Sequence, residues 1–510
     1  MRISHSILAA ALVASLTACE RDATTTSAAG KTTATVAIEP CRVKGFDIEI
    51  KCAKLPVFED REGKQGRKID IHVAILPAKS DRKKPDPIFI FAGGPGQSAI
   101  EVGPRVLPAL SRLNRERDLV FVDQRGTGKS NKLACKVDER DSLEGFGADA
   151  EVKAFIEGCL AEARKHADPR LYTTTLALQD LDDVRKALGY DKINLWGASY
   201  GTRAAFEYVR RFPQHTRSAV LDGMAPFDMA LPLSFVLDSH ASLGALLQAC
   251  AKEAGCAKTF PNLEADLTQL VKSLDANPRR VTVNHPRTGE PIKVRVTGTM
   301  VLGGVRGAMY APNAASAVPA AIQAAKADDF GPLAALGLAV GGAVMDELAL
   351  GMHLSVVCAE DWPLVQKASA AAVPRAGLYG EELIRDHRNM CAVWPKGSIP
   401  ADFHAPVKSD VPILILSGGV DPATPPRHAE AVLPGLSRAK HVVAPNIGHG
   451  VSPQGCAPDL IKRFVEDGNA DKVDGACLAK LPRPVFFQPL AVAAAPGNPT
   501  DVPAEKDAQK

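Results

Sequence analysis

Short apolar runs recur along the chain at intervals that suit alternating strands and helices. Several runs are nearly continuous in Val, Ile, Leu and Phe, as a strand buried on both faces of a parallel sheet requires. Apolar residues then return at helical spacing at Leu181, Val184 and Leu188, and Gly189 predicts the end of that helix. The predicted strands are residues 68–76, 87–93, 118–124, 193–197, 218–223, 412–418 and 440–445. This alternation predicts an α/β fold with a mostly parallel central sheet.

The interval between Asp222 and Pro412 is too long for a single crossover. Within it, an apolar stripe that starts near Asn262 predicts a helix, and residues 279–298 predict a β-hairpin around a Pro/Gly turn. We interpret residues 228–350 as a mostly helical cap, inserted before the late strands over the carboxyl edge of the sheet, where open α/β sheets bind ligands. An independent domain beside the core is the alternative. The continuation of the strand series on both sides argues against it.

Composition changes this picture little. The 510 residues, of which 46% are hydrophobic, suffice for one large domain with an insertion or for two domains. The formal charge of +3 arises from 61 basic and 58 acidic residues. This near balance gives no electrostatic reason to expect a nucleic-acid partner.

The cysteines indicate an oxidising compartment. Of eleven cysteines, an even number remains when Cys19 is set aside, and consecutive ones pair naturally into short loops. The sequence does not determine which cysteines pair. A zinc site is the alternative, but no C-x2-C pair occurs and the spacings are irregular. We therefore expect disulfides, and neither a metal nor a cofactor.

The N-terminus predicts export. Arg2 precedes an apolar run that is too short to span a bilayer and ends in Leu-Thr-Ala-Cys19. This tetrapeptide resembles the bacterial lipobox, which implies that residues 1–18 are a signal peptide and that Cys19 is acylated. An ordinary signal peptide cut nearby is the alternative. Residues 19–38 and 489–510 contain too few large apolar groups to pack, and we expect a flexible tether and a disordered tail.

A serine stands where one predicted strand meets a helix. Gly197-Ala198-Ser199-Tyr200-Gly201 follows the apolar run 193–197 and precedes a helical pattern. This context turns a G-x-S-x-G match into a candidate nucleophile elbow, in which small flanking residues permit a tight turn. Ser199 is therefore the predicted nucleophile. The alternative is a structural turn.

A serine hydroxyl needs a base, and the base needs an acid that orients it. Asp421 follows the predicted strand 412–418, and His449, between two glycines, follows the strand 440–445. With Ser199 they give the chain order Ser, Asp, His that accompanies a serine on a nucleophile elbow. Asp222 also ends a strand and competes for the acid role. We prefer Asp421 because it follows the strand next to the histidine's own.

An oxyanion needs two donors. The backbone N–H of Tyr200 is the first candidate, because it lies next to the serine at the start of a helix. In "FAGGPG" (91–96) two glycines follow a strand and allow the main chain to approach a substrate. Since Pro95 has no N–H, Gly94 is the predicted second donor, with Gly93 as its alternative.

Several longer stretches resemble a known family. The stretches are "AGGPGQS", "DQRGTGKS", "WGASYGTRAAFEYVRRFP" followed by "AVLDG", and "GGVDPATPP" with "GHG". In this order they resemble the α/β-hydrolase serine peptidases of the proline iminopeptidase and tripeptidyl aminopeptidase (TAP-like) group. The resemblance implies an α/β-hydrolase core in two parts, 39–227 and 351–488, with a TAP-like second part and a helical cap. It also implies removal of proline or short peptides from free N-termini.

Carried over by motif, the resemblance gives Ser199, Asp421 and His449 as the triad. One departure is Ala92, where proline iminopeptidases usually have histidine, and this favours the exported tripeptidyl branch. An aminopeptidase must also bind an ammonium, for which "VVCAEDWP" offers Glu360 and Asp361, with Glu360 as the candidate. A solvated or salt-bridged acid is the alternative for either residue. For Asp123 and Arg125, at the end of another central strand, we expect a buried structural pair. Support of the oxyanion loop is the alternative.

The sequence therefore predicts an exported, lipid-anchored serine exopeptidase of the bacterial envelope that acts on peptides. A carboxylesterase with the same triad is the first alternative, because the same groups cleave esters and amides. A non-catalytic envelope lipoprotein with a hydrolase fold is the second.

Overall fold

The computed structural model describes residues 36–135, 149–285, 288–337, 348–372, 377–380 and 382–488. The predicted signal peptide, Cys19, most of the tether and the tail 489–510 lie outside these residues. None of the helices in the described ranges is both long and apolar enough to cross a bilayer.

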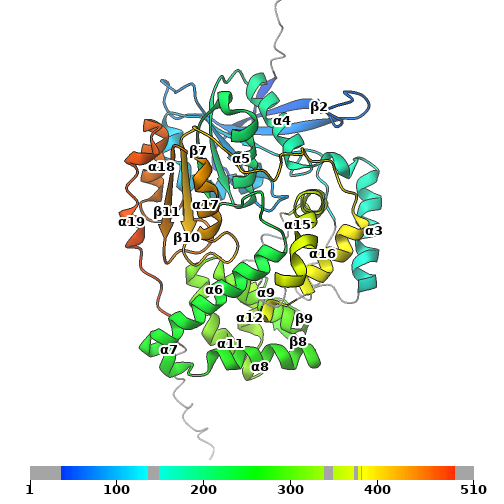
Figure 1. The fold of residues 1–510 in the computed structure, drawn as a ribbon, viewed down its shortest axis with the longest axis vertical. Coiled ribbons are helices and arrows are strands. Elements are labelled where there is room, and N and C mark those ends of the chain that lie inside the picture. The colour runs from blue at the N-terminus through cyan, green and yellow to red at the C-terminus, as the bar shows by residue number, and fades with distance from the viewer. Residues whose placement is uncertain are drawn as a thin grey trace, which may run out of the picture. The chain divides into compact units, whose positions relative to one another are not determined.

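A nine-stranded sheet lies at the centre of the fold, in the order β1-β2-β3-β5-β4-β6-β7-β10-β11 (Figure 1). Neighbouring strands from β5 to β11 are parallel, whereas β1, β2 and β3 pair antiparallel. The strands are β1 Ile38–Cys41, β2 Ile50–Phe58, β3 Lys68–Leu76, β4 Ile88–Phe91, β5 Leu119–Val122, β6 Ile193–Ala198, β7 Thr216–Asp222, β10 Ile413–Gly418 and β11 Ala439–Ala444. The predicted α/β fold with a mostly parallel sheet is confirmed.

All seven predicted strands are present, but two further strands precede them. The strand β2 contains two lysines and a proline among its apolar residues, and β1 is largely exposed at the edge of the sheet. Neither strand has the continuous apolar run that reveals a doubly buried strand. Ile38, which the sequence placed at the end of the tether, instead begins β1.

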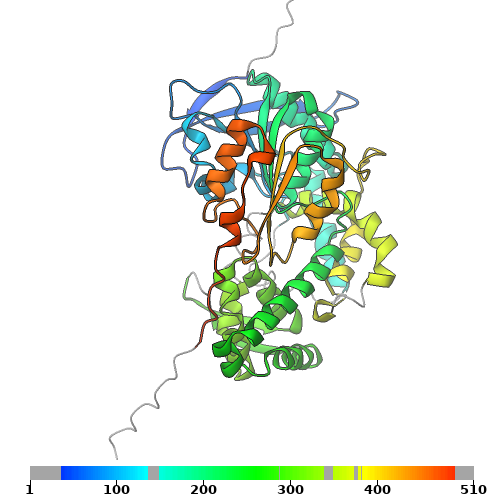
Figure 2. The ribbon, with the colours of Figure 1, turned by 60° about the vertical axis from the view of Figure 1, so that its left-hand side comes forward.

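Helices cover both faces of the sheet (Figures 1 and 2). One apolar cluster packs α1, α18 and α19 on one face, and another packs α3, α4, α5 and α17 on the other. These helices are α1 Ala99–Leu110, α3 Asp149–Arg164, α4 Thr174–Ala187, α5 Tyr200–Arg211, α17 Pro426–Val432, α18 Ala457–Asp467 and α19 Ala476–Ala479. Single 3₁₀ turns are η1 Leu113–Arg115, η2 Pro169–Leu171, η3 Pro213–His215, η7 Leu433–Gly435 and η8 Ala470–Lys472. Gly189 follows α4 with a φ of 78°, as predicted for a helix end.

The chain between β7 and β10 forms a mostly helical region with an apolar core of its own. The predicted helix after Asn262 and the predicted hairpin are both present. The elements of this core are α6 Leu233–Lys252, α7 Ala254–Thr259, α8 Leu263–Ala276, β8 Arg279–Asn284, β9 Pro291–Val296, α9 Gly298–Met309, α10 Pro312–Ala315, α11 Val318–Lys326 and α12 Gly331–Gly337. We call them the cap, whose predicted bounds of 228–350 stay a prediction.

The helices that follow the cap pack on the main core. They are α14 Leu350–Val356, the π-helix η5 Val357–Asp361, α15 Trp362–Ala372 and α16 Glu382–Val393. Figure 1 shows α16 beside α3. This second segment therefore links the cap to the sheet.

Each cysteine in the described residues forms a disulfide with the next or the preceding cysteine of the chain. The pairs are Cys41–Cys52, Cys135–Cys159, Cys250–Cys256, Cys358–Cys391 and Cys456–Cys477. This confirms the predicted disulfides, and the same thiols cannot form a zinc site. Disulfides persist in oxidising compartments, so they indicate an extracytoplasmic protein.

Candidate active site

Ser199 lies in a sharp turn between β6 and α5. Its φ of 57° is in the left-handed region, which non-glycine residues rarely adopt. A Cβ atom on Gly197 would lie 2.3 Å from the Gly201 carbonyl oxygen, and one on Gly201 would lie 2.1 Å from the Phe91 carbonyl oxygen. Both flanking positions therefore require glycine. The backbone strain holds the partly exposed serine at the corner, the geometry that a nucleophile elbow needs.

Asp421 and His449 meet after β10 and β11. Nδ1 of His449 lies 2.8 Å from Oδ2 of Asp421. The other oxygen of Asp421 accepts the backbone N–H groups of Ala423 and Thr424 at 2.8 and 2.9 Å. The Thr424 hydroxyl also donates to Asp421 Oδ2, at 2.9 Å. The buried carboxylate is thus fixed on both oxygens, and it fixes the imidazole in turn.

The two groups shift each other's pKa. Burial raises the pKa of the Asp421 carboxyl, but the charge and hydrogen bond of His449 outweigh it, so this pKa lies below its ordinary value. Burial lowers the pKa of the His449 imidazole, but the charge and hydrogen bond of Asp421 outweigh it, so this pKa lies above its ordinary value. The pair therefore stabilises an imidazolium, the ion that forms when a histidine takes a proton from serine.

Asp222 occupies a different position from Asp421. Its carboxylate accepts the backbone N–H groups of Val451 and Ser452 at 2.9 and 2.7 Å. It therefore holds the loop that follows His449. The carboxylate hydrogen-bonded to the imidazole is that of Asp421.

Ser199 and His449 both adjoin Gly223, the residue after β7. The Ser199 N–H donates to the carbonyl oxygen of Asp222, at 2.9 Å. A Cβ atom on Gly223 would lie 3.4 Å from Cε1 of His449. Because β6, β7, β10 and β11 are parallel neighbours, their carboxyl ends share one edge of the sheet. The structure places the serine, acid and base predicted from the sequence at this edge.

The glycine loop after β4 lies against the serine. A Cβ atom on Gly93 would be 3.2 Å from the Ser199 Cβ, and Gly94 has a φ of 108°. Tyr200 begins α5, where the first backbone N–H groups have no partner within the helix. Backbone donors from both segments therefore adjoin the serine. Their role as an oxyanion hole stays a prediction.

Asp123 and Arg125 do not pair with each other, contrary to our expectation. Asp123 accepts the Ser98 hydroxyl at 2.5 Å and the Ile100 N–H at 3.1 Å, and so holds the start of α1, just beyond the glycine loop. Arg125 pairs with Asp180 at 2.6 Å. The two side chains leave the same strand end towards different partners, which the sequence alone does not show.

Glu360 is fully buried in the π-helix Val357–Asp361. The N–H and the hydroxyl of Thr174 donate to its carboxylate at 2.7 and 2.8 Å. The same hydroxyl oxygen lies 2.7 Å from that of Tyr200. Glu360 is therefore linked through Thr174 to Tyr200, the first residue of α5. Its predicted contact with a substrate ammonium stays a prediction.

Arg203 gives this buried cluster its positive charge. Nη1 of Arg203 lies 2.9 Å from the Asp361 carboxylate and 3.8 Å from that of Glu360. Burial raises the pKa of Glu360 to about 8 and that of Asp361 to about 6, against the lowering effect of Arg203. With two carboxyls to one guanidinium, the cluster is neutral when one carboxyl keeps its proton.

Two residues beside His449 were not predicted from the sequence, Thr424 and Tyr310. Thr424 lies 3.2 Å from Nδ1 of His449, and its signal is a Thr three residues after Asp421 in a Pro-rich turn. Tyr310 follows α9 in the cap. Its carbonyl oxygen accepts the His449 N–H at 2.9 Å, and the two rings are 5.0 Å apart. No local pattern predicts this contact, because it joins the cap to a loop of the core.

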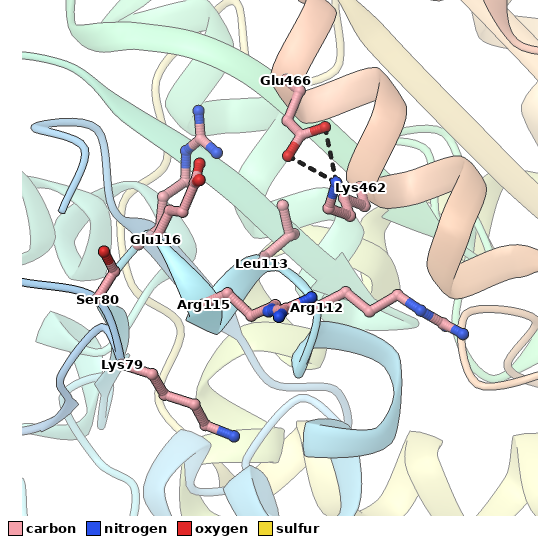
Figure 3. A pocket seen from close by; sticks show the side chains of 9 residues that line it. Lys79, Ser80, Arg112, Leu113, Arg115, Glu116, Lys462 and Glu466 are labelled. Carbon is pink, nitrogen blue, oxygen red and sulfur yellow. Dashed lines mark hydrogen bonds and ion pairs between the residues drawn. The ribbon is translucent and has the colours of Figure 1, made fainter. Parts of the chain in front are cut away.

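A surface pocket of about 510 Å³ lies elsewhere, between η1 and α18 (Figure 3). It is lined by Lys79, Ser80, Arg112, Leu113, Arg115, Glu116, Arg117, Lys462 and Glu466. Arg115 and Arg117 precede β5, so this pocket is at the amino ends of the parallel strands. Ser199 is at the opposite edge.

A mostly parallel sheet with a strained serine between strand and helix, and an acid and a base after later strands, defines the α/β-hydrolase class. Comparison with known families agrees. Residues 86–248 match the family described as "alpha/beta hydrolase fold", and residues 376–477 match the family described as "TAP-like protein". The chain therefore has the α/β-hydrolase fold, its second part matches the TAP-like family, and the predicted resemblance to TAP-like serine peptidases is confirmed.

Curated relatives include peptidases and an esterase. The chain is 30% identical to "Serine protease Hip1" of Mycobacterium tuberculosis over 54% of this chain and 56% of that protein. It is 29% identical to "Tripeptidyl aminopeptidase" of Streptomyces lividans over 34% and 35%. It is 24% identical to "Carboxylesterase B" of M. tuberculosis over 74% and 76%. The chain thus spans about half the length, or less, of the peptidases that it matches.

Proposed function

We propose that this protein is an exported serine exopeptidase that removes short peptides or proline from free N-termini. The observation that carries the proposal is the strained Ser199 at the same sheet edge as the Asp421–His449 pair, whose atoms are 2.8 Å apart. Similarity to two peptidases supports peptides as the substrates. Release from the N-terminus rests on the tripeptidyl aminopeptidase similarity alone.

In the proposed reaction, Ser199 Oγ attacks the scissile carbonyl carbon while His449 takes the hydroxyl proton. The N–H groups of Tyr200 and Gly94 stabilise the oxyanion of the tetrahedral intermediate. His449 then gives its proton to the leaving amine, which leaves an acyl group on Ser199. A water molecule, whose proton passes to His449, then attacks the ester carbonyl carbon. The acyl group leaves as a carboxylic acid, and His449 returns the proton to Ser199. Asp421 keeps the imidazole oriented throughout.

The test is hydrolysis of short peptides with free and with blocked N-termini. We expect cleavage of the free peptides only, and a loss in Ser199→Ala of about 10³-fold or more in kcat. Ser111→Ala is a matched control, because Ser111 is exposed at the end of α1. Equal rates for Ser199→Ala and the parent would remove Ser199 from the mechanism. Faster cleavage of blocked peptides would exclude action at the N-terminus.

Carboxylesterase action is the second candidate. The similarity to carboxylesterase B favours it, because that match covers about three quarters of both chains. The triad chemistry is common to esters and amides, so the binding pocket decides between them. Comparing kcat/KM on simple acyl esters with kcat/KM on N-terminally free peptide amides distinguishes the two. A preference for esters at every peptide length would favour the esterase.

We further propose a lipid anchor at Cys19 in the bacterial envelope. The disulfides support an extracytoplasmic location, and the sequence before Cys19 supports the anchor. Mass spectrometry of the mature N-terminus tests this. An acylated Cys19 as the first residue is expected, and an unmodified N-terminus beyond Cys19 would contradict it.

A further inference from the structure

We propose that Arg306 and Tyr379 form a subsite that binds a carboxylate of the substrate next to the scissile bond. This inference rests on the proposed function in taking Ser199 as the reacting group. It adds the chemical class that the site selects, a substrate bearing a free carboxylate. The supporting observations are the position of Arg306, its lack of an acidic partner, and a buried hydroxyl near it that has no hydrogen-bond partner.

Arg306 is placed on the cap face that meets His449. It precedes Tyr310 by four residues on α9, and residues at this spacing lie on one face of a helix. Tyr310 accepts the His449 N–H through its carbonyl oxygen and packs its ring against the imidazole. The side chain of Arg306 is therefore one helical turn from the contact between the cap and the candidate base.

The position of the Arg306 guanidinium is indicated by its contact with the Phe235 ring and by the effect of its charge on neighbouring groups. Its central carbon lies 5.3 Å from the centre of the Phe235 ring, which packs with Val357 at the start of the π-helix. Its positive charge also acts on groups of other elements. Burial has the largest effect on the pKa of Tyr379, His387 and His449, and the charge of Arg306 contributes a lowering to each. The guanidinium thus lies between the cap and the core.

Within the described residues Arg306 has no acidic partner, and its guanidinium contacts the Phe235 ring. It is only partly exposed. A partly buried guanidinium with no carboxylate beside it loses part of its solvation without a compensating ion pair. A substrate carboxylate would supply that pair, and the planar fork of arginine suits it.

Tyr379 offers a second donor. Its hydroxyl is buried and, within the described part of the chain, has no hydrogen-bond partner. The ring packs against both the main core and the cap core, so the residue lies at the boundary between them. An unsatisfied buried hydroxyl is costly, and a carboxylate oxygen would satisfy it.

The charge also orients the substrate. A free ammonium would be repelled by Arg306, so the amino end of a peptide does not face α9. The carboxylate that does so is either the free C-terminus of a short peptide or the side chain of an Asp or Glu beside the scissile bond. Both present the same planar anion to the guanidinium.

The experiment measures kcat/KM for matched peptides in the full chain. One arm compares a free C-terminal acid with its amide, and the other compares Glu with Gln beside the scissile bond. We expect the parent to prefer the acid in one arm, which identifies the source of the carboxylate. Arg306→Gln should reduce that preference by about 10- to 100-fold, and Tyr379→Phe by about 3- to 10-fold. Arg280→Gln, on the exposed strand β8 of the cap, should keep it.

A second readout does not need turnover. Binding of the same acid and amide peptides is measured by calorimetry on Ser199→Ala protein, with and without Arg306→Gln. Tighter binding of the acid, lost with Arg306→Gln, supports the subsite even where no peptide is cleaved and the proposed peptidase activity fails. Equal affinities of acid and amide for Ser199→Ala, or a preference that survives Arg306→Gln, overturns the subsite while leaving the role of Ser199 intact.

Discussion

The core and the cap contribute to the candidate site in different ways. On the core side, Ser199, Asp421 and His449 follow buried strands and are fixed by backbone hydrogen bonds. On the cap side, Arg306 and Tyr310 extend from a helix with an apolar core of its own. The candidate reacting side chains all come from the core, whereas the cap adds the charged side chain of Arg306 and a backbone contact from Tyr310 to His449. We therefore assign the chemistry to the core and selectivity to the cap.

The sharpest test of the core side compares its two aspartates. Asp421→Asn should lower kcat by about 10³- to 10⁴-fold, because the imidazole loses the anion that orients it and stabilises its charge. Asp222→Asn should instead lower the melting temperature, because Asp222 holds the two N–H groups after His449. Both are measured with one peptide substrate and by calorimetry. If Asp222→Asn lost more activity than Asp421→Asn at equal stability, the acid would be misassigned.

Removing one disulfide from each region tests how much the core and the cap contribute to the melting temperature. Cys358–Cys391 closes a 33-residue separation in the main core, and Cys250–Cys256 closes a 6-residue separation in the cap. Loop-closure entropy gives about 4 kcal/mol for the first and about 2 kcal/mol for the second. Replacing each pair with alanines should therefore lower the melting temperature more for the core pair. A larger loss from the cap pair would show that the cap determines the stability of the fold.

The smallest effect concerns the pH dependence. His449 must be neutral to act as a base, and Asp421 raises its pKa above the ordinary 6.5 despite burial. As pH rises, kcat/KM should increase through a pKa above 6.5, since protonated histidine cannot accept the serine proton. Asp222 also raises this pKa and Arg306 lowers it. Arg306→Gln should therefore move the acidic limb to higher pH, by less than about one unit, while Arg280→Gln leaves it in place.

A limb at or below pH 6.5 in the parent would contradict the Asp421–His449 assignment. An unmoved limb in Arg306→Gln would place the guanidinium too far from His449 for the proposed subsite. The first result would contradict the assignment made in the core, and the second would contradict the subsite proposed in the cap.

Much of the core side is predictable from the sequence because its signals are local. Apolar runs mark doubly buried strands, and the glycines around Ser199 mark a turn that admits no side chain. Asp421 and His449 follow such runs directly. The presence of disulfides was also predictable from the even number of cysteines, but their pairing between neighbours in chain order is shown only by the structure.

Other features could not be predicted, since they depend on contacts between distant segments. Arg125 pairs with Asp180, 55 positions away, and Glu360 binds Thr174, 186 positions away. A charged residue at a strand end has several partners within reach, and only packing selects one.

The sequence by itself determined the sheet, the serine turn and the order of acid and base, because backbone sterics and burial act over a few residues. The tertiary structure alone decided that His449 bonds Asp421 and not Asp222, and that Arg306 lies over the Phe235 ring. Those outcomes depend on which strand ends and helix faces come together, and such proximity has no signature along the chain.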